Sequence, residues 1–425
     1  MRWTPPSQVC DPAHATALEP CRAAGYAPPR HHEDPILPIY NRIAEFQADL
    51  TATRRDIHAH PEMGFQEHRT SALVARQLEA WGIEVHRGIA GTGLVGVLRN
   101  GTSKRSIGLR ADMDCLPMQE ISDMPHRSTV PGQMHACGHD GHTTMLLGAA
   151  RYLAETRNFD GTVHFIFQPA EEGGGGGRVM VEEGLFDRFP TDQVYALHND
   201  PELPLGEARI TPGPVLAAAD RITITVHGKG GHASRPQACI DPVLVGAQIV
   251  VAAQSIVSRS MDPIDTAVVS LCQFHAGSAG NVIPEVAELN GTVRTFRPEV
   301  QDMVEARLGA LVKSIAEAHG ARAELAYTRG YPPTINHEAE SLRAQKAAAD
   351  VLGDSRIHRN APPRMGAEDF SYMLQKVPGA FIGIGQGDGG RHTVGLHHPR
   401  YDFNDDLIPL GASVFARLVE QELPR

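Results

Sequence analysis

Residues 134–144 gather side chains that bind metals. These eleven residues contain one thiol, three imidazoles and one carboxylate, and two glycines let the backbone turn tightly between them. Cys137 and His139 lie two positions apart, a spacing that directs both donors to one side of a turn. A thiolate with imidazoles suits zinc and its first-row neighbours rather than magnesium or calcium. The alternative is a polar turn whose histidines cap a following helix, but the density of donors favours a metal site.

Four further candidate donors follow short apolar runs of the kind that form strands. Glu171 and Glu172 come after one run and precede five glycines, and His198 and His397 follow two later runs. Adjacent carboxylates on an extended backbone point in opposite directions, so one glutamate binds the metal and the other is free to carry a proton. A solvated linker is the alternative for such a pair, and its position after a strand argues against it.

The number of candidate ligands indicates two metal ions. Cys137, His139, one of the two glutamates, His198 and His397 are more ligands than one tetrahedral structural site takes. Two ions that share a bridging ligand, about 3.5–4 Å apart, hold a water between them, lower its pKa towards about 7 and polarise a carbonyl. The hydroxide attacks, and a nearby carboxylate transfers the proton to the leaving group. These parts predict hydrolysis of an amide.

Several other polar residues have less specific roles. Asp112, Asp114 and Asp140 are candidates for orienting a ligand histidine, and a structural role in a turn is the alternative for the first two. His58 and His60 are as consistent with packing at a helix end as with a place in the site.

The elements around these residues predict an α/β fold with a mostly parallel central sheet. Apolar runs with strand character alternate with helical segments, and in such sheets ligands bind beyond the carboxyl ends of the strands. The candidate donors lie there. The expected strands cover residues 106–110, 163–167, 194–197 and 380–385, and the helical segments between them cover 143–155 and 339–352.

A different pattern interrupts this alternation between residues 218 and 329. Strand-like and helical segments follow one another there as β-α-β-β-α-β, the ferredoxin-like arrangement. We therefore expect a small domain inserted into a larger one. The predicted parts are a flexible extension at residues 1–34, a first catalytic part at 35–217, the insertion at 218–329 and a second catalytic part at 330–425.

Composition excludes some classes of partner and suggests a compartment. The formal net charge of −11 in 425 residues, without clustered Lys and Arg, argues against a nucleic-acid partner. No run of 18 or more apolar residues and no secretory leader is found, so we expect no membrane span and a cytoplasmic protein. The six cysteines have no framework spacing, as expected in a reducing compartment.

Several motifs together resemble the amidohydrolase branch of the aminoacylase and carboxypeptidase metallopeptidase family. This branch includes hippurate hydrolases, N-acyl-amino-acid amidohydrolases and the plant enzymes that cleave indoleacetyl-amino acids. The resemblance covers residues 36–425 and implies a two-metal, exopeptidase-like catalytic domain. It rests on residues 111–114, 135–142, 168–173, 230–234 and 366–370.

The resemblance also implies roles for individual residues. Cys137 would bridge two divalent metals, with Glu171 as general base and acid; the other ligands would be His139, Glu172, His198 and His397. His397 is chosen over His398 because it lies two residues before Pro399, as the motif requires. The inserted domain would be a dimerisation lid whose His232 reaches the partner's active site, and the substrate carboxylate would be held by Asn281 and Arg294.

The sequence thus predicts a cytoplasmic, homodimeric metal-dependent amidohydrolase that cleaves hippurate-like N-acyl amino acids. Higher homo-oligomers remain an alternative to the dimer. Zinc or manganese are the expected metals, and the donor set also accepts cobalt or nickel. The alternatives for the function are a dipeptidase or exopeptidase on the same scaffold, and a non-catalytic metal-dependent protein that binds amino-acid conjugates.

Overall fold

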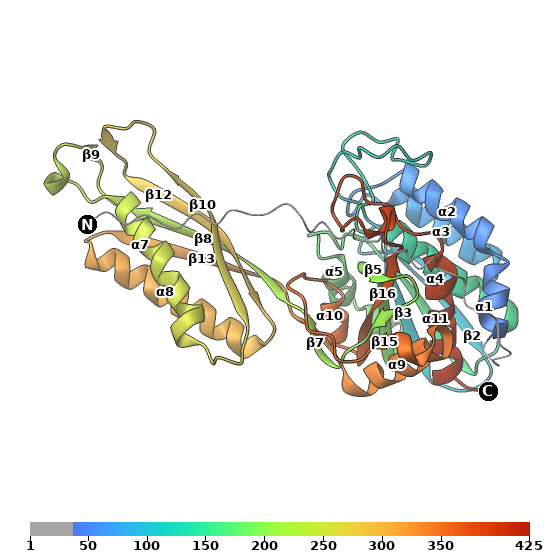
Figure 1. Ribbon diagram of the computed structural model, residues 1–425. Helices are drawn as coiled ribbons and strands as arrows, with labels where there is room; N and C mark the ends of the chain where they lie inside the picture. Colours follow the sequence, from blue (N-terminus) through green and yellow to red (C-terminus); the bar gives the residue numbers. More distant parts are fainter. Residues whose placement is uncertain (1–36) are drawn as a thin grey trace, which may run out of the picture. The chain divides into compact units, whose positions relative to one another are not determined.

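Two main sheets organise the described part of the chain, residues 37–425, in this computed structural model (Figure 1). The larger sheet has eight strands in the order β1-β2-β4-β3-β5-β16-β6-β15, and the smaller has four in the order β10-β12-β8-β13. The flexible extension predicted at residues 1–34 lies outside the described residues.

The centre of the larger sheet is parallel. Its inner strands β4, β3, β5 and β16 pair in parallel, whereas β1, β2 and β6 join antiparallel to their inner neighbours, so the expectation of a mostly parallel sheet is confirmed. The strands are β1 (Glu84–Ile89), β2 (Gly93–Asn100), β3 (Ser106–Asp112), β4 (Gly161–Gln168), β5 (Gln193–Pro204), β6 (Ala208–Arg209), β15 (Ile357–His358) and β16 (Gly379–Gly387).

Helices cover both faces of this sheet, which explains why its strands read as continuous apolar runs. The larger domain has two hydrophobic cores. Adjacent residues of β4 belong to different ones, Phe165 to the larger core and Ile166 to the smaller core. The helices of the larger domain are α1 (Leu37–Ala44), α2 (Gln47–Ala59), α3 (His68–Ala80), α4 (His139–Thr156), α5 (Gly176–Glu182), α6 (Leu185–Arg188), α9 (Glu338–Leu352), α10 (Ser371–Leu374) and α11 (Leu407–Glu422).

The smaller sheet belongs to the inserted domain, and its β-α-β-β-α-β order is confirmed. All its strand pairs are antiparallel, and its two helices pack on a separate hydrophobic core. At the start of α7, the Asp241 side chain accepts a hydrogen bond from the Val243 backbone N–H (2.9 Å) and so caps the helix, which has Pro242 as its first residue. The elements are β8 (Ala218–His227), α7 (Pro242–Ser255), β10 (Ala267–Ala276), β12 (Val286–Thr295), α8 (Pro298–Ala318) and β13 (Arg322–Tyr331).

Helix α7 departs from the expectation that no segment is long and apolar enough to cross a membrane. The continuous helical stretch Pro242–Ser260 has a mean hydropathy of 1.4, and 28% of it is buried. Val245, Ile249 and Ala253 on its inner side belong to the core of the inserted domain, so one face of the helix packs on that domain. On its outer side Val251 is 74% exposed, which leaves an apolar surface.

Candidate metal centre

The five predicted ligands lie in two groups that share the Cys137 sulfur. Cys137, His139 and His198 form one group, and the other consists of Cys137, Glu172 and His397. Within each group the potential ligand atoms lie within 4.8 Å of one another. We expect this arrangement for two cations bridged by one thiolate, which is the role predicted for Cys137.

Gly138 sets the geometry of the first group. Its left-handed backbone (φ +99°) starts α4 at His139 rather than near residue 143, so Cys137 precedes the helix and His139 opens it. A side chain at Gly138 is excluded, since its Cβ would lie 2.2 Å from Asn199 Oδ1. His198, on β5, brings its Nε2 within 3.5 Å of the Cys137 sulfur.

His397 belongs to the second group, whereas His398 does not. The His397 backbone N–H donates to the Ala136 carbonyl (2.8 Å), and its Nε2 lies 3.1 Å from Glu172 Oε1. His397 has a positive φ of 60°, an uncommon backbone for a non-glycine residue and typical of constrained functional sites. His398 instead accepts at Nδ1 a hydrogen bond from the Arg400 backbone N–H (3.1 Å). The geometry supports His397 as the ligand.

The surroundings of His139 fit a metal ligand. Its Nδ1 faces the Asp114 carbonyl (2.9 Å) and carboxylate (3.2 Å), while its buried Nε2 has no hydrogen-bond partner among residues 37–425. An imidazole fixed through one nitrogen presents the other to a metal. Asp114 also accepts hydrogen bonds from the backbone N–H groups of Glu171 (3.0 Å) and Glu172 (2.9 Å), so it positions both ligand-bearing segments.

The other two aspartates considered for this positioning role lie differently. Asp112 contacts His142 Nδ1 (2.6 Å), and its carboxylate stays 3.8 Å from His139 Nε2. Asp140 turns away from the ligand groups and contacts His58 Nδ1 (2.8 Å). Adjacent helix residues point in different directions, so Asp140 cannot follow His139 into the site.

Glu171 lies beside the ligand groups in an acidic, buried environment. It is 7% exposed, and its carboxylate gathers with those of Glu368 and Asp369. Burial, together with these negative charges, raises the pKa of Glu171 well above its usual value, although His139 acts in the opposite direction. A carboxyl group whose pKa is raised in this way binds a proton more readily than a free one, which suits Glu171 to accept and return a proton.

Arg110 is a residue that sequence reasoning missed. Its side chain is 2% exposed and donates to Asp112 (2.7 Å), Glu368 (2.8 Å) and Asp369 (3.0 Å). This buried cation offsets the acidic groups behind the site, since unpaired buried carboxylates would be strongly destabilising. The available signal was a charged residue inside the apolar run at residues 106–110.

His58 belongs to a buried network next to α4, not to the ligand groups. Burial alone would lower its pKa, but the hydrogen bond and charge of Asp140, together with Glu120, raise the pKa to about 9. His60 is half-buried and faces the Asp56 carbonyl (2.8 Å). The contacts of His58 and His60 are therefore structural, and neither residue contributes to the ligand groups.

The shifted pKa of His58 predicts a pH-dependent contribution to stability. Because the folded pKa (about 9) exceeds the unfolded value near 6.5, this contribution is full below about pH 6.5 and is lost as the pH rises to about 9. The shift corresponds to about 3 kcal/mol. Denaturant unfolding at pH 6 and pH 9.5 should show that His58→Gln destabilises the protein more at pH 6 than at pH 9.5. An equal loss at both pH values for His58→Gln would contradict this role.

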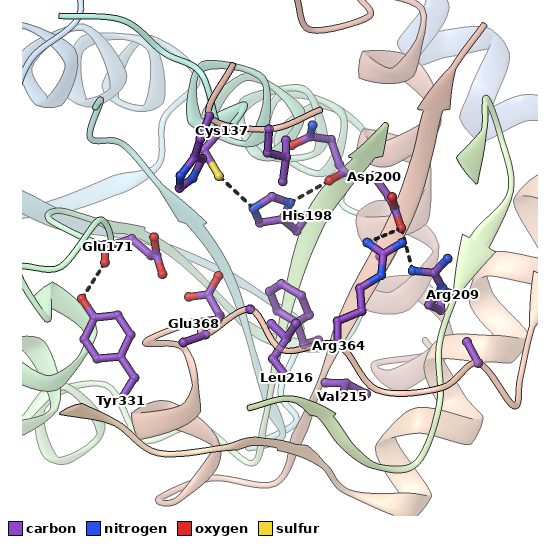
Figure 2. A pocket seen from close by; sticks show the side chains of 18 of the residues that line it. Cys137, Glu171, His198, Asp200, Arg209, Val215, Leu216, Tyr331, Arg364 and Glu368 are labelled. Carbon is purple, nitrogen blue, oxygen red and sulfur yellow. Dashed lines mark hydrogen bonds and ion pairs between the residues drawn. The ribbon is translucent and has the colours of Figure 1, made fainter. Parts of the chain in front are cut away.

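A cavity of about 340 Å³ opens beside the ligand groups (Figure 2). Cys137, Glu171, Glu172, His198 and His397 all line it. Much of the remaining wall is apolar, with contributions from Val215, Leu216, Phe381 and Leu396. The cavity thus offers an apolar chamber next to the candidate metal ligands and the candidate base.

The three residues predicted to act from the inserted domain do not line this cavity. His232 is exposed on β9 (Gly231–His232), which pairs with β11 (Val282–Ile283), and the Asn281 carbonyl accepts from the Ala233 backbone N–H (3.0 Å). Arg294 lies near the other end of β12, roughly 27 Å along the strand from its first residue. Within one chain, Asn281 and Arg294 therefore lie too far apart to bind the same substrate carboxylate.

The sequence profile described as Peptidase family M20/M25/M40 matches residues 108–421. The chain belongs to this family. Within the M20 family it is 40% identical over 381 residues to hippurate hydrolase of Campylobacter jejuni, covering 88% of this chain and 97% of the relative. It is 38% identical over 380 residues to IAA-amino acid hydrolase ILR1-like 4 of Arabidopsis thaliana, covering 88% of this chain and 86% of the relative.

A solved M20 structure shows the same fold. The YXEP protein of Bacillus subtilis, described as a dinuclear metal binding peptidase, superposes with a TM-score of 0.78 at 34% identity and covers 88% of this chain and 98% of its own. The resemblance to the amidohydrolase branch of the family is confirmed by these relatives. This M20 chain is accordingly a hydrolase of the amidohydrolase type.

Proposed function

We propose that this M20 chain hydrolyses the amide bond of hippurate-like N-acyl amino acids and releases a carboxylic acid and a free amino acid. The observation that carries the proposal is the position of Glu171, a buried carboxylate with a raised pKa beside two ligand groups that share Cys137. The relatives named for hippurate and for IAA-amino acids support this class of substrate.

The ligand groups fit two divalent transition-metal ions, with zinc or manganese first and cobalt or nickel as further candidates. Such a pair, when bound, polarises a carbonyl and lowers the pKa of water. Glu171 takes a proton from the attacking water and delivers it to the leaving nitrogen, since it lies beside the ligand groups and its pKa is raised by burial and by the neighbouring carboxylates. The apolar wall formed by Leu216 and Phe381 excludes water from the acyl group.

The cavity favours N-acyl substrates over unblocked dipeptides. A dipeptide would place a charged amine in the chamber. The carboxylates farther along the wall are already paired, Asp200 with two arginines and Glu368 with Arg110. A non-catalytic binder would have no use for the proton-carrying Glu171. Both alternatives are therefore less well supported than hydrolysis of an acyl amide.

Assays of the purified, metal-loaded protein test the proposal directly. We expect release of glycine and benzoate from hippurate, with kcat/KM at least about tenfold above that for unblocked dipeptides. Hydrolysis restricted to dipeptides would favour the exopeptidase alternative. Tight binding of hippurate without turnover would favour the binding protein.

We also propose that the active unit is a homodimer in which His232, with Asn281 beside it, acts on the partner's site. His232 is exposed and does not line the cavity of its own chain, and α7 offers an exposed apolar surface within the same inserted domain. A partner subunit can supply a residue that a single chain places outside its cavity.

Mixing two inactive variants tests this arrangement. Glu171→Gln and His232→Ala chains, refolded together in equal amounts, should regain about a quarter of the wild-type activity, because half of the dimers would hold one intact site. Each variant alone serves as the control. If His232 acts within its own chain, the mixture gains no activity and the dimer proposal is wrong. Sedimentation of the active protein as a monomer would also contradict the proposal.

A further inference from the structure

An ion-paired cluster with two arginines lines the cavity away from the metal ligands. Asp200, on β5, is 4% exposed and accepts from Arg209 of β6 (2.9 Å), and its carboxylate also pairs with Arg364 (3.0 Å). All three residues line the same cavity as Cys137 and Glu171, and Figure 2 shows both guanidinium groups converging on Asp200. The cluster has no part in the hydrolysis described above.

The sheet fixes how far this cluster lies from the metal ligands. His198 of β5 is paired with Gly383 of β16, and Gly383 is paired in turn with Arg209 of β6. The three residues thus form one row on one face of the sheet, with Arg209 two strand spacings, roughly 10 Å, from His198. Gly383 has no side chain and itself lines the cavity, so the space between His198 and Arg209 is open.

The cluster leaves positive charge in the cavity. The two guanidinium groups share the buried carboxylate of Asp200. Arg364 also pairs with Glu202, but Glu202 is 76% exposed, so water screens its charge. Asp200 is the single side-chain acceptor of Arg209 among residues 37–425, although a guanidinium carries five N–H donors. Arg209 therefore keeps donors for a further anion.

We propose that Arg209, held in place by Asp200 and assisted by Arg364, binds a carboxylate at the distal end of the acyl group. This inference rests on the proposed function and narrows it to N-acyl amino acids whose acyl part is a diacid. With the scissile carbonyl at the ligand groups, an aromatic ring would pack between Leu216 and Phe381, and its far carboxylate would face Arg209. An arginine binds a carboxylate through charge-assisted, bidentate hydrogen bonds.

Two substrates of matched shape test the inference. N-(4-carboxybenzoyl)glycine and N-(4-methylbenzoyl)glycine differ at the distal group alone, so the ratio of their kcat/KM values reports on that group. We expect the wild-type protein to prefer the carboxylate substrate at least about tenfold, as a charge-assisted hydrogen bond allows. Arg209→Met and Arg364→Met should each reduce this ratio, with Arg209→Met bringing it close to one.

Two further variants serve as controls. Arg209→Lys keeps the positive charge and should keep part of the preference. Arg359→Met removes an exposed arginine that pairs with Asp354 outside the cavity and should keep the whole preference. Retained metal content in each variant shows that the fold is intact.

Distinct outcomes separate this inference from the function on which it rests. Hydrolysis of the methylbenzoyl substrate at an equal or higher rate than the carboxybenzoyl substrate would overturn the inference and leave the amidohydrolase proposal standing. An unchanged ratio in Arg209→Met would also overturn it, as would an equal loss for both substrates, which would assign the cluster a structural role. If the protein hydrolysed neither of the two matched substrates nor hippurate, both proposals would be overturned.

Discussion

Replacing Glu171 by glutamine should lower kcat by a factor of about 10² to 10⁴, the usual effect of losing a general acid and base. The amide has nearly the shape of the carboxylate but cannot accept the proton of the attacking water. Glu171 lies beside both ligand groups, yet the predicted ligand of the adjacent pair is Glu172. Metal content and the affinity for hippurate should therefore stay close to those of the wild-type protein.

The neighbouring residue provides a matched control for this variant. Glu172→Gln is the same chemical change one position along the chain, but it removes a carboxylate of the Cys137, Glu172 and His397 group. We expect this variant to lose metal, and activity with it. If Glu171→Gln kept wild-type turnover, or if it lost metal as Glu172→Gln does, the role assigned to Glu171 would be wrong.

Replacing Cys137 by serine should remove metal from both positions and reduce hydrolysis at least about a thousandfold, because both ions contribute to the reaction. The Cys137 sulfur belongs to both ligand groups. Each of the other four ligands belongs to one of these two groups. Elemental analysis of the purified variant measures the loss. Cys239→Ser, a change at a half-buried cysteine of the inserted domain, should retain metal and activity.

A variant of Cys137 that kept a full complement of metal would exclude a bridging thiolate. A variant that lost metal from one position alone would restrict Cys137 to a single ion. His139→Ala and His397→Ala complete the comparison, since these residues are assigned to different positions and each should weaken one site more than the other.

The fold and the ligand groups were within reach of sequence reasoning for an identifiable reason. Apolar runs such as residues 163–167 are buried on both faces, so the periodic pattern reports directly on the sheet. Glu171 and Glu172 follow the end of β4, where the rule for such sheets places ligands. His198 was expected to follow a strand at residues 194–197, but β5 continues past it to Pro204. The helix at residues 139–156 was placed too late because Gly138, read as part of a turn, starts it.

The groups that position the ligands were harder to predict, because they depend on contacts between distant segments. Arg110 and Glu368 are 258 positions apart in sequence, yet their side chains form a buried pair at 2.8 Å. Asp114 rather than Asp140 orients His139, a choice decided by side-chain direction at the helix start. The placement of Asn281 and Arg294 at different ends of the inserted sheet likewise depends on strand register.

Metal titration of the wild-type protein tests the central claim most directly. After removal of bound metal with a chelator, activity on hippurate should be lost and should return as zinc or manganese is added, with the rise ending at two equivalents per chain. Elemental analysis of freshly purified active protein should give the same number. A preparation that hydrolyses its substrate at full rate without any transition metal, and that chelators leave unaffected, would contradict the account.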